Sequence, residues 1–422
     1  MSGILIAAPS SGSGKTTITL ALLRLLSREG IAVRGAKSGP DYIDPRFHEA
    51  ACGAPCLNLD AWAMTPDRLR TLAQNDGLLI VEGAMGLFDG APPDGKGSAA
   101  DLARILGLPV ILVVDAARMA GSVAPLVKGF ARHDPQIHIN GLILNNVGSD
   151  RHERMLRRAL EPTNIPIIAA MRRSRSLTQP SRHLGLVQAQ EHPALETFLN
   201  DAADTLAETL DRDTFVALTA PLTAAGPVIK TPPPAQTIAL ARDAAFAFSY
   251  PHQLQDWAAQ GAEIRFFSPL ANDPVPKAEF VFLPGGYPEL HAAKIAAAGT
   301  FMTSLRNAAK DTRIYGECGG YMVLGKGLTD AGGTRHEMAG LLDLETSFET
   351  RKLHLGYRNL TPLGGPFSMP LKGHEFHYAT TLHAVGTPLF SATDAEGASL
   401  PHMGLINGNV CGSFAHVIDQ PA

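Results

Sequence analysis

The sequence contains little cysteine, and this shortage excludes a protein held together by disulfide bonds. Only four cysteines occur in 422 residues, and Cys52 and Cys56 form a single Cys-x-x-x-Cys pair. A second pair that would complete a zinc site is missing. Free cysteine usually behaves as a small buried apolar residue, so we predict structural roles for Cys52, Cys56 and Cys411.

Basic charge and long apolar runs are also scarce. Lysine and arginine number 36 against 40 aspartates and glutamates, which gives no basic surface for nucleic acid. No apolar run is long enough to span a bilayer, and the first expected strand follows Met-Ser-Gly too closely for a secretory leader. We therefore expect a cytoplasmic enzyme of two domains, without a nucleic-acid or membrane partner. The oligomeric state stays open, with a homo-oligomer among the alternatives.

A glycine-rich segment near the N-terminus predicts a phosphate-binding loop. It reads APSSGSGKTT and lies between an apolar strand expected over 4–6 and an apolar helix expected over 18–26. Its glycines let backbone N–H groups face phosphate, while lysine adds a cation and threonine a hydroxyl for Mg²⁺. Pro9 replaces the first glycine of the usual pattern. We assign ATP binding to Gly12, Ser13, Gly14, Lys15, Thr16 and Thr17, with Thr16 also contacting Mg²⁺.

A second polar segment, KSGPDYIDP, follows a strand expected over 32–36. Its glycine and prolines exclude a helix over this run. Loops at the carboxyl ends of parallel strands bind ligands in open α/β sheets. We therefore expect Lys37 to contact phosphate, and Asp41 and Asp44 to hold Mg²⁺ or its waters. A turn stabilised by the aspartates alone is the alternative.

An acidic residue closes the apolar strand expected over 78–81. Glu82 stands where phosphate-loop proteins place a second Mg²⁺ contact, so we predict that it is the metal partner of Thr16. The glycine-rich segment that follows carries Asp89, for which an ordinary surface turn is an equal alternative.

Further alternation of strands and helices up to residue 210 predicts a parallel, doubly wound α/β sheet. Asn145 or Asn146 could hydrogen-bond the base of the nucleotide, and we assign Asn146 to the ATP site; capping of the next helix is the alternative. A run of basic residues is either solvated or receives an anionic substrate. It comprises Arg172, Arg173, Arg175, Arg182 and His183.

A proline-rich segment separates two halves of the chain. We expect an ATP-binding domain over 1–218, a stiff linker over 219–236 and a second α/β domain over 237–422.

The second half contains Glu-Cys-Gly-Gly-Tyr between an apolar strand and an apolar helix. A cysteine at such a turn has the geometry of a nucleophile elbow, and the helix N-terminus is expected to lower the pKa of the Cys318 thiol. Backbone N–H groups of Gly319 and of Gly285 or Gly286 could form an oxyanion hole. His416 is the preferred base, and the competing bases are His374 and His377.

Taken together, these motifs resemble those of the cobyrinic acid a,c-diamide synthase family over nearly the whole chain. The resemblance is carried, in the family's order, by APSSGSGKTT, KSGPDYIDP, EGAMGLFDG, SRHLGL, PGGYPE, ECGGY, GHEFHY and GSFAH. It implies a dethiobiotin-synthetase-like ATPase domain fused to a class I glutamine amidotransferase domain.

The resemblance also implies roles for individual residues. Cys318 attacks glutamine after activation by His416, and the released ammonia replaces phosphate on an acyl phosphate made with ATP and Mg²⁺. The implied substrate is a corrinoid, cobyrinic or hydrogenobyrinic acid, with or without cobalt, amidated on its a and c acetates. The positions that match the family's ATP, Mg²⁺ and substrate site are Asp41, Tyr42, Ile43, Asp44, Glu82 and Asp89.

One departure from the wider class I amidotransferase pattern is present. Class I enzymes usually carry Glu two residues after the catalytic His, where this chain has Ile418, so either a dyad operates or another carboxylate such as Glu375 orients the imidazole.

Three alternative functions stay open. The first is a cobyric acid synthase, which would amidate other corrin side chains. A partitioning-type ATPase switch usually has a second lysine early in the loop, where this chain has Ala8, Pro9 and Ser10. A ligase with an inactive C-terminal domain is the third alternative.

Overall fold

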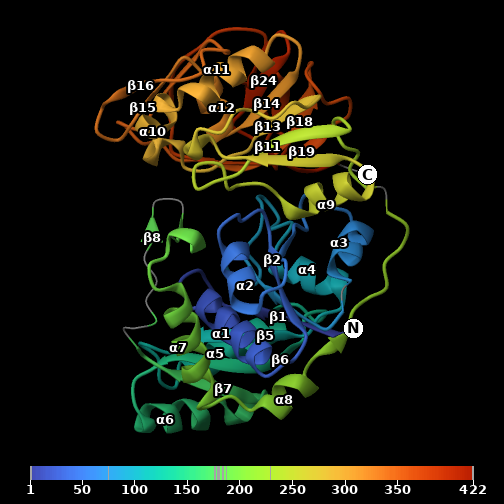
Figure 1. Ribbon diagram of the computed structural model, residues 1–422. Helices are drawn as coiled ribbons and strands as arrows, with labels where there is room; N and C mark the ends of the chain where they lie inside the picture. Colours follow the sequence, from blue (N-terminus) through green and yellow to red (C-terminus); the bar gives the residue numbers. More distant parts are fainter. Residues whose placement is uncertain are drawn as a thin grey trace. The chain divides into compact units, whose positions relative to one another are not determined.

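The computed structural model describes residues 2–420 except 75, 175–176, 178–180, 183–184, 187 and 229. The chain divides into two compact units, residues 1–228 and 229–422, which are described one at a time. In Figure 1 the first unit runs from blue to green and the second from yellow to red. None of the helices in the described ranges is long and apolar enough to cross a membrane.

The first unit is built on a parallel sheet in the order β3-β2-β4-β1-β5-β6-β7, with β10 antiparallel to β1. Its strands are short and buried along almost their whole length, as expected where helices cover both faces. The strands are β1 Ser2–Ala7, β2 Val33–Ser38, β3 Leu57–Leu59, β4 Leu78–Glu82, β5 Val110–Asp115, β6 Ile139–Val147, β7 Ile167–Arg172 and β10 Ala220–Pro221.

Helices alternate with these strands, as the sequence predicts. Helix α1 packs against both α2 and α7, whereas α3 packs on α4 and α5 on α6. The helices are α1 Lys15–Arg28, α2 Asp44–Cys52, α3 Pro66–Ala73, α4 Ala99–Leu106, α5 Val123–His133, α6 Asp150–Leu160, α7 Leu195–Ala207 and α8 Arg212–Ala217. The short elements η1 Glu161–Thr163, β8 Ser181–Arg182, β9 Gly185–Leu186 and η2 Ala189–Glu191 lie between α6 and α7.

Two local expectations for this unit are wrong. A helix does enter the segment 37–45, because α2 begins at Asp44 and Pro45 lies in its first turn, where the missing N–H removes no intrahelical bond. Asn146 is not a helix cap, since it lies inside β6. The cap of α6 is Ser149, whose side chain accepts a hydrogen bond from the N–H of His152.

The second unit has a central sheet in the order β12-β11-β13-β14-β24-β23, parallel except for the edge strand β23. Its strands are β11 Thr237–Ala241, β12 Glu263–Phe267, β13 Phe280–Leu283, β14 Arg313–Glu317, β23 Leu405–Asn407 and β24 Val410–Ser413. The helical elements are α9 Pro251–Ala259, η3 Pro269–Ala271, η4 Pro288–Leu290, α10 Ala292–Ala297, α11 Gly299–Ala308 and α12 Gly319–Leu324.

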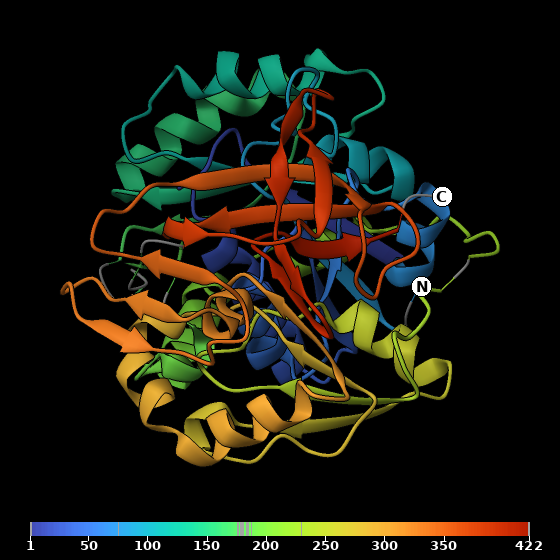
Figure 2. The ribbon, with the colours of Figure 1, turned by 90° about the horizontal axis from the view of Figure 1, so that it is seen from above.

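A five-stranded antiparallel sheet and a four-stranded mixed sheet complete this unit and are drawn mainly in orange and red in Figure 2. The five-stranded sheet contains β22 Ser399–Met403, β21 Phe390–Thr393, β18 His354–Pro362, β19 Leu371–His377 and β25 His416–Asp419. The four-stranded sheet contains β16 Arg335–Glu337, β15 Gly327–Thr329, β17 Leu344–Ser347 and β20 Thr380–Ala384.

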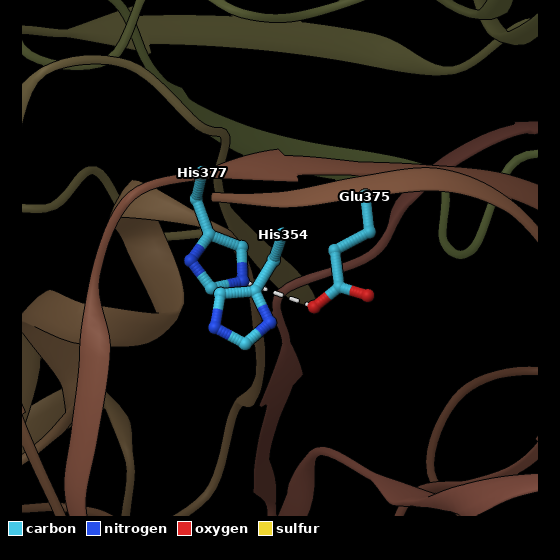
Figure 3. Close-up of side chains that lie close together, drawn as sticks. All are labelled: His354, Glu375 and His377. Atoms are coloured by element: carbon cyan, nitrogen blue, oxygen red, sulfur yellow. Dashed lines mark hydrogen bonds and ion pairs between the residues drawn. The ribbon is translucent and has the colours of Figure 1, made fainter. Parts of the chain in front are cut away.

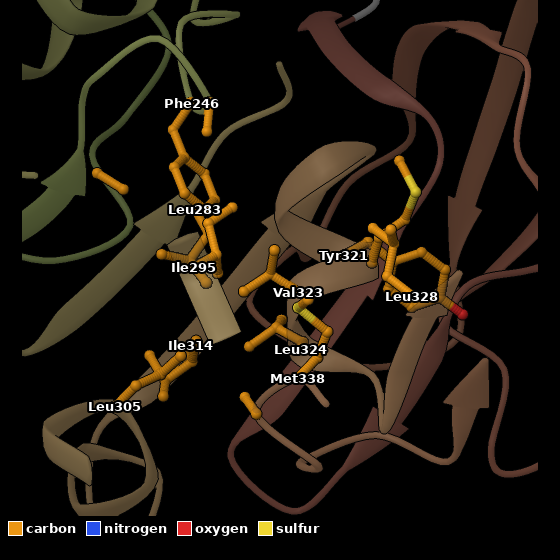
Figure 4. Close-up of a cluster of buried hydrophobic side chains, with 14 of the residues drawn as sticks. Phe246, Leu283, Ile295, Leu305, Ile314, Tyr321, Val323, Leu324, Leu328 and Met338 are labelled. Atoms are coloured by element: carbon orange, nitrogen blue, oxygen red, sulfur yellow. The ribbon is translucent and has the colours of Figure 1, made fainter. Parts of the chain in front are cut away.

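A buried apolar cluster holds α12 against the central sheet (Figure 4). Leu283 of β13 and Ile314 of β14 lie on the sheet side, while Val323 and Leu324 project from α12. All four are at most 1% exposed. The strand, turn and helix that carry Cys318 are therefore fixed by dense packing.

Candidate functional site

The phosphate loop in the first unit requires glycine at two positions. Gly12 and Gly14 have φ values of 78° and 90°, in the left-handed region that other residues rarely adopt. A Cβ on Gly14 would also lie 2.1 Å from Nδ2 of Asn145. That amide donates a hydrogen bond to the carbonyl of Ser13 at 2.9 Å. Asn145 therefore supports the loop, whereas Asn146, the residue assigned from the sequence, donates to Asp115 at 3.0 Å.

Lys15 links the phosphate loop to the segment after β4. Its ammonium donates to the carbonyls of Ser10 at 3.2 Å and Met85 at 2.5 Å. Burial lowers the pKa of Lys15, and the nearby Glu82 opposes this effect. The loop glycines and Lys15 thus form the arrangement of N–H groups and one cation that phosphate requires.

Glu82 lies at the centre of a buried polar network. Its Oε1 accepts from the Thr16 hydroxyl at 2.6 Å and from the Lys37 ammonium at 2.8 Å. Its Oε2 lies 2.6 Å from Nε2 of His48. Burial alone would raise the pKa of Glu82, but Lys37 and His48 lower it well below its usual range. Glu82 is therefore ionised at neutral pH.

Lys37 reaches this network from inside β2, not from a loop beyond it. It faces Glu82 in the β2–β4 register and also donates to Asp44 at 2.5 Å. Although burial alone would lower the pKa of Lys37, Asp44 and Glu82 raise it. Burial and the neighbouring Asp41 raise the pKa of Asp44 to about 7, against the opposing effect of Lys37. Lys37 therefore forms ion pairs with two carboxylates, those of Asp44 and Glu82.

The remaining acidic residues assigned from the sequence make local turns. Asp41 accepts from the N–H groups of Ile43 and Asp44 at 2.7 and 3.1 Å. Asp89 accepts from the N–H of Gly86 at 2.8 Å. These contacts are the turn alternatives anticipated for both residues, and each uses one carboxylate oxygen. The segment with Asp41 follows β2, which pairs with β4, the strand that ends at Glu82. The segment with Asp89 follows β4, which pairs with β1, the strand that leads into the phosphate loop.

His48 belongs to the network but was not identified from the sequence. Its ring is fully buried and packs on β2, where a Cβ on Gly35 would lie 2.6 Å from Nδ1. Nδ1 lies 3.3 Å from Sγ of Cys56. Although burial alone would lower the pKa of His48, Cys56 and Glu82 raise it to about 10. His48 follows Asp44 by four residues, which places both side chains on one helical face. This spacing is the sequence signal that could have identified His48.

Of the basic run, the structure describes the side chains of Arg172 and Arg173. Arg172 pairs with Asp150 at 2.6 Å and with Glu153 at 2.9 Å. Arg173 donates to the carbonyl of Ala117 at 3.3 Å. Arg175 and His183 lie outside the described residues, as does the side chain of Arg182.

In the second unit, Cys318 lies in the strained turn between β14 and α12. Its φ and ψ are 46° and −102°, a conformation that costs energy for a residue with a side chain. The turn is also too tight for a side chain at Gly320, where a Cβ would lie 1.9 Å from the carbonyl oxygen of Leu283. The structure therefore has the nucleophile-elbow geometry expected for this segment.

The expected lowering of the Cys318 pKa is wrong. Burial and the nearby Glu289 raise the pKa of the thiol well above its usual value, and the hydrogen bond from Gly319 N–H does not compensate. The side chain is almost completely enclosed, and α12 is only one and a half turns long. Cys318 therefore needs a base to remove its proton during reaction.

The turn after β13 brings the other predicted residues to this elbow. A Cβ on Gly285 would lie 2.2 Å from Cε1 of His416, so the imidazole packs directly on this turn. A Cβ on Gly319 would lie 3.1 Å from the backbone N of Gly286. The turn after β13 thus lies against both His416 and the turn that holds Cys318. These two turns carry the backbone segments of the expected oxyanion hole.

His374 and His377 are less suitable bases than His416. His374 faces His416 in the β19–β25 register, but burial and the proximity of His416 lower the pKa of His374 to about 3. It accepts no proton at neutral pH. His377 stacks on Phe414, with ring centroids 3.9 Å apart, and hydrogen-bonds Glu375 at 3.0 Å.

Glu375 belongs to a separate cluster with His354 and His377 (Figure 3). Its Oε2 pairs with Arg358 at 2.8 Å and its Oε1 with His377 at 3.0 Å. Although burial alone would raise the pKa of Glu375, these partners lower it to about 2. The candidate ligand atoms of the three residues lie within 4.8 Å of one another. The two imidazoles are nearly parallel, however, so their in-plane lone pairs do not converge on one ion.

Comparisons with known proteins agree with this division into two sites. A family model described as the CobQ/CobB/MinD/ParA nucleotide binding domain matches residues 4–187. Another, described as the CobB/CobQ-like glutamine amidotransferase domain, matches residues 237–421. These matches and the two sheets confirm the predicted α/β fold of a phosphate-loop domain followed by an amidotransferase domain. The bounds 1–218, 219–236 and 237–422 stay a prediction.

Three curated relatives align with nearly the whole chain, and each is named hydrogenobyrinate a,c-diamide synthase. The protein from Brucella abortus biovar 1 is 53% identical over 431 residues, covering 99% of both chains. That from Rhizobium meliloti is 52% identical and also covers 99% of both. That from Rhodobacter capsulatus is 50% identical and covers 99% of this chain and 98% of its own.

Proposed function

Because the chain belongs to the hydrogenobyrinate a,c-diamide synthase family, we propose that it amidates the a and c acetates of hydrogenobyrinic or cobyrinic acid. It is a carbon–nitrogen ligase of cobalamin biosynthesis that uses ATP and glutamine. The observation that carries the proposal is the presence in one chain of a phosphate loop centred on Lys15 and a cysteine elbow centred on Cys318.

The two sites supply the two halves of one reaction. A carboxylate resists substitution because its leaving group would be oxide. Transfer of the γ-phosphoryl group of ATP gives an acyl phosphate and ADP, and ammonia then displaces inorganic phosphate to leave the amide. The loop N–H groups and Lys15 would hold the phosphates during this transfer.

Mg²⁺ fits the oxygen donors beside the phosphate loop. The Thr16 hydroxyl and the ionised Glu82 are hard oxygen ligands of the type that Mg²⁺ selects. When bound, the ion would neutralise charge on the nucleotide phosphates. Asp44 is paired with Lys37 and would act on the ion through that pair or through water.

The second site would release ammonia from glutamine. His416 takes the proton of the Cys318 thiol, and the sulfur attacks the side-chain amide of glutamine. Backbone N–H groups of Gly319 and Gly286 would stabilise the oxyanion. Loss of ammonia leaves a thioester, which water hydrolyses to glutamate and free thiol.

We expect His48→Ala to weaken the metal site. Loss of the imidazole removes the partner that fixes Oε2 of Glu82, so the Mg²⁺ concentration for half-maximal ATP turnover should rise about 10–100-fold. The measurement is a Mg²⁺ titration of ATP turnover in the presence of corrin and ammonium. His138→Ala, at an exposed position of the same unit, is the control. An unchanged Mg²⁺ dependence in a folded His48→Ala protein would contradict the assigned role.

The proposal is tested by mass spectrometry of the corrin after incubation with ATP, Mg²⁺ and glutamine. Two successive hydroxyl-to-amide replacements are expected, and parallel reactions with metal-free and cobalt-containing corrin identify the preferred substrate. Fragmentation locates the amides. Amidation at other side chains would favour a cobyric acid synthase, and ATP hydrolysis without any amidation would overturn the proposal. A cytoplasmic location stays a prediction, and the oligomeric state stays open.

A further inference from the structure

We propose that Glu317, the residue directly before Cys318, orients the His416 imidazole during glutamine hydrolysis. Glu317 would thereby act as a positioning residue in place of the carboxylate that class I amidotransferases usually carry two residues after the histidine. This inference rests on the proposed amidotransferase function of Cys318 and His416.

The carboxylate of Glu317 faces the imidazole inside the protein. Its Oε2 lies 3.6 Å from Nδ1 of His416, and the two side chains are 4% and 2% exposed. Oε1 is fixed separately, because it accepts from the backbone N–H of Val417 at 3.0 Å and from the hydroxyl of Tyr315 at 3.2 Å. One oxygen is thus anchored to the residue after His416, while the other is directed at the ring.

The strand geometry explains why this residue is available. Side chains alternate along β14, so Tyr315 and Glu317 share one face while Gly316 lies on the other. Strand β24 pairs with β14 and leads through a short turn into β25, which begins at His416. Glu317, the last residue of β14, therefore reaches His416, the first residue of β25.

The other carboxylate considered for this role has partners of its own. Both oxygens of Glu375 are engaged, one by Arg358 and the other by His377. The usual position two residues after the histidine is occupied by Ile418, which is fully buried. The contact between Glu317 and the His416 ring, in contrast, is observed.

The contact selects the imidazole tautomer that catalysis requires. A carboxylate beside Nδ1 favours the proton on that nitrogen and leaves the Nε2 lone pair for the Cys318 proton. It also stabilises the imidazolium formed after transfer. The distance of 3.6 Å exceeds that of a hydrogen bond, but contacts of this type commonly shorten when substrate binds.

Glu317→Gln tests the inference because glutamine keeps the shape and the acceptor for Val417 N–H but removes the charge. We expect kcat for glutamine hydrolysis to fall at least about 100-fold. KM for glutamine should change little by comparison, because the lost carboxylate acts through the imidazole. Ammonium-dependent amidation, which needs only the first unit's chemistry, should be unchanged. Glu263→Gln removes an equal charge at an exposed position of the same unit and should alter neither quantity.

A second measurement avoids any folding defect of the variant. In the wild-type full chain with ¹⁵N-labelled histidine, the His416 signals, assigned by their loss in His416→Gln, should show protonation on Nδ1 at neutral pH. Protonation on Nε2, or a folded Glu317→Gln enzyme with the wild-type rate of glutamine hydrolysis, overturns the inference alone. If Cys318→Ala retains glutamine-dependent activity, the proposed function of the site fails instead.

Discussion

Cys318→Ala is expected to abolish amidation with glutamine and to leave amidation with ammonium near the wild-type rate. Glutamine hydrolysis needs a covalent thioester, and loss of a nucleophile commonly lowers the rate by at least about 10³-fold. Free ammonium at a pH that supplies ammonia bypasses this step. The two rates are measured on the same corrin by mass spectrometry.

The control for this variant is Cys411→Ala. Cys411 is also buried, and burial raises the pKa of its thiol to about 12, but it lies within β24 and not at a strand-to-helix turn. Its substitution should leave both activities largely intact. Glutamine-dependent activity surviving in Cys318→Ala would show that ammonia is released by other residues, whereas loss of both activities would indicate a role for Cys318 beyond the thioester.

Glu82→Gln is expected to abolish amidation with either nitrogen source. The carboxylate contacts Thr16, Lys37 and His48 at once, so removing its charge leaves Lys37 paired with Asp44 and takes the charged partner of Nε2 away from His48. The metal site also loses its charged oxygen. We expect ATP turnover to fall at least about 100-fold, as for other groups that stabilise transferring phosphate.

Two comparisons separate this effect from unfolding. Glu196→Gln removes an exposed carboxylate that pairs with Arg24 in the same unit and should retain activity. Lys15→Gln removes the loop cation without disturbing the pair between Glu82 and Lys37 and should be equally inactive. If Glu82→Gln proved folded and active with ammonium, Glu82 would have no part in phosphoryl transfer.

The sequence predicts the contact between Thr16 and Glu82 because both positions follow from local patterns. A glycine-rich turn after one buried strand and an acidic residue closing another must meet when parallel strands are neighbours. Lys37 was assigned to a loop, yet it meets Glu82 across the β2–β4 register from inside the strand. Sequence periodicity gives the face of a strand but not its register with a neighbour.

The residues that the sequence did not reveal depend on tertiary packing. His48 lies on a helix whose first turn contains Pro45, and its role depends on burial against Gly35. Glu317 lies far from His416 in the sequence, and the pairing of β14 with β24 brings their side chains together. The Cys318 pKa was expected to fall because the helix is visible in the sequence, whereas the opposing burial is not.

The strand β10 has a practical consequence for anyone who divides this protein into separately expressed halves. Ala220 and Pro221 pair with β1, and Thr223 hydrogen-bonds the carbonyl of Leu106 through its N–H and its hydroxyl. In the other half, Thr231 is already bound to Asp256 and Asp419. A truncation at residue 218 would remove the partners of Ser2 and Gly3 at the start of β1, whereas a boundary within 224–230 keeps both sets of contacts.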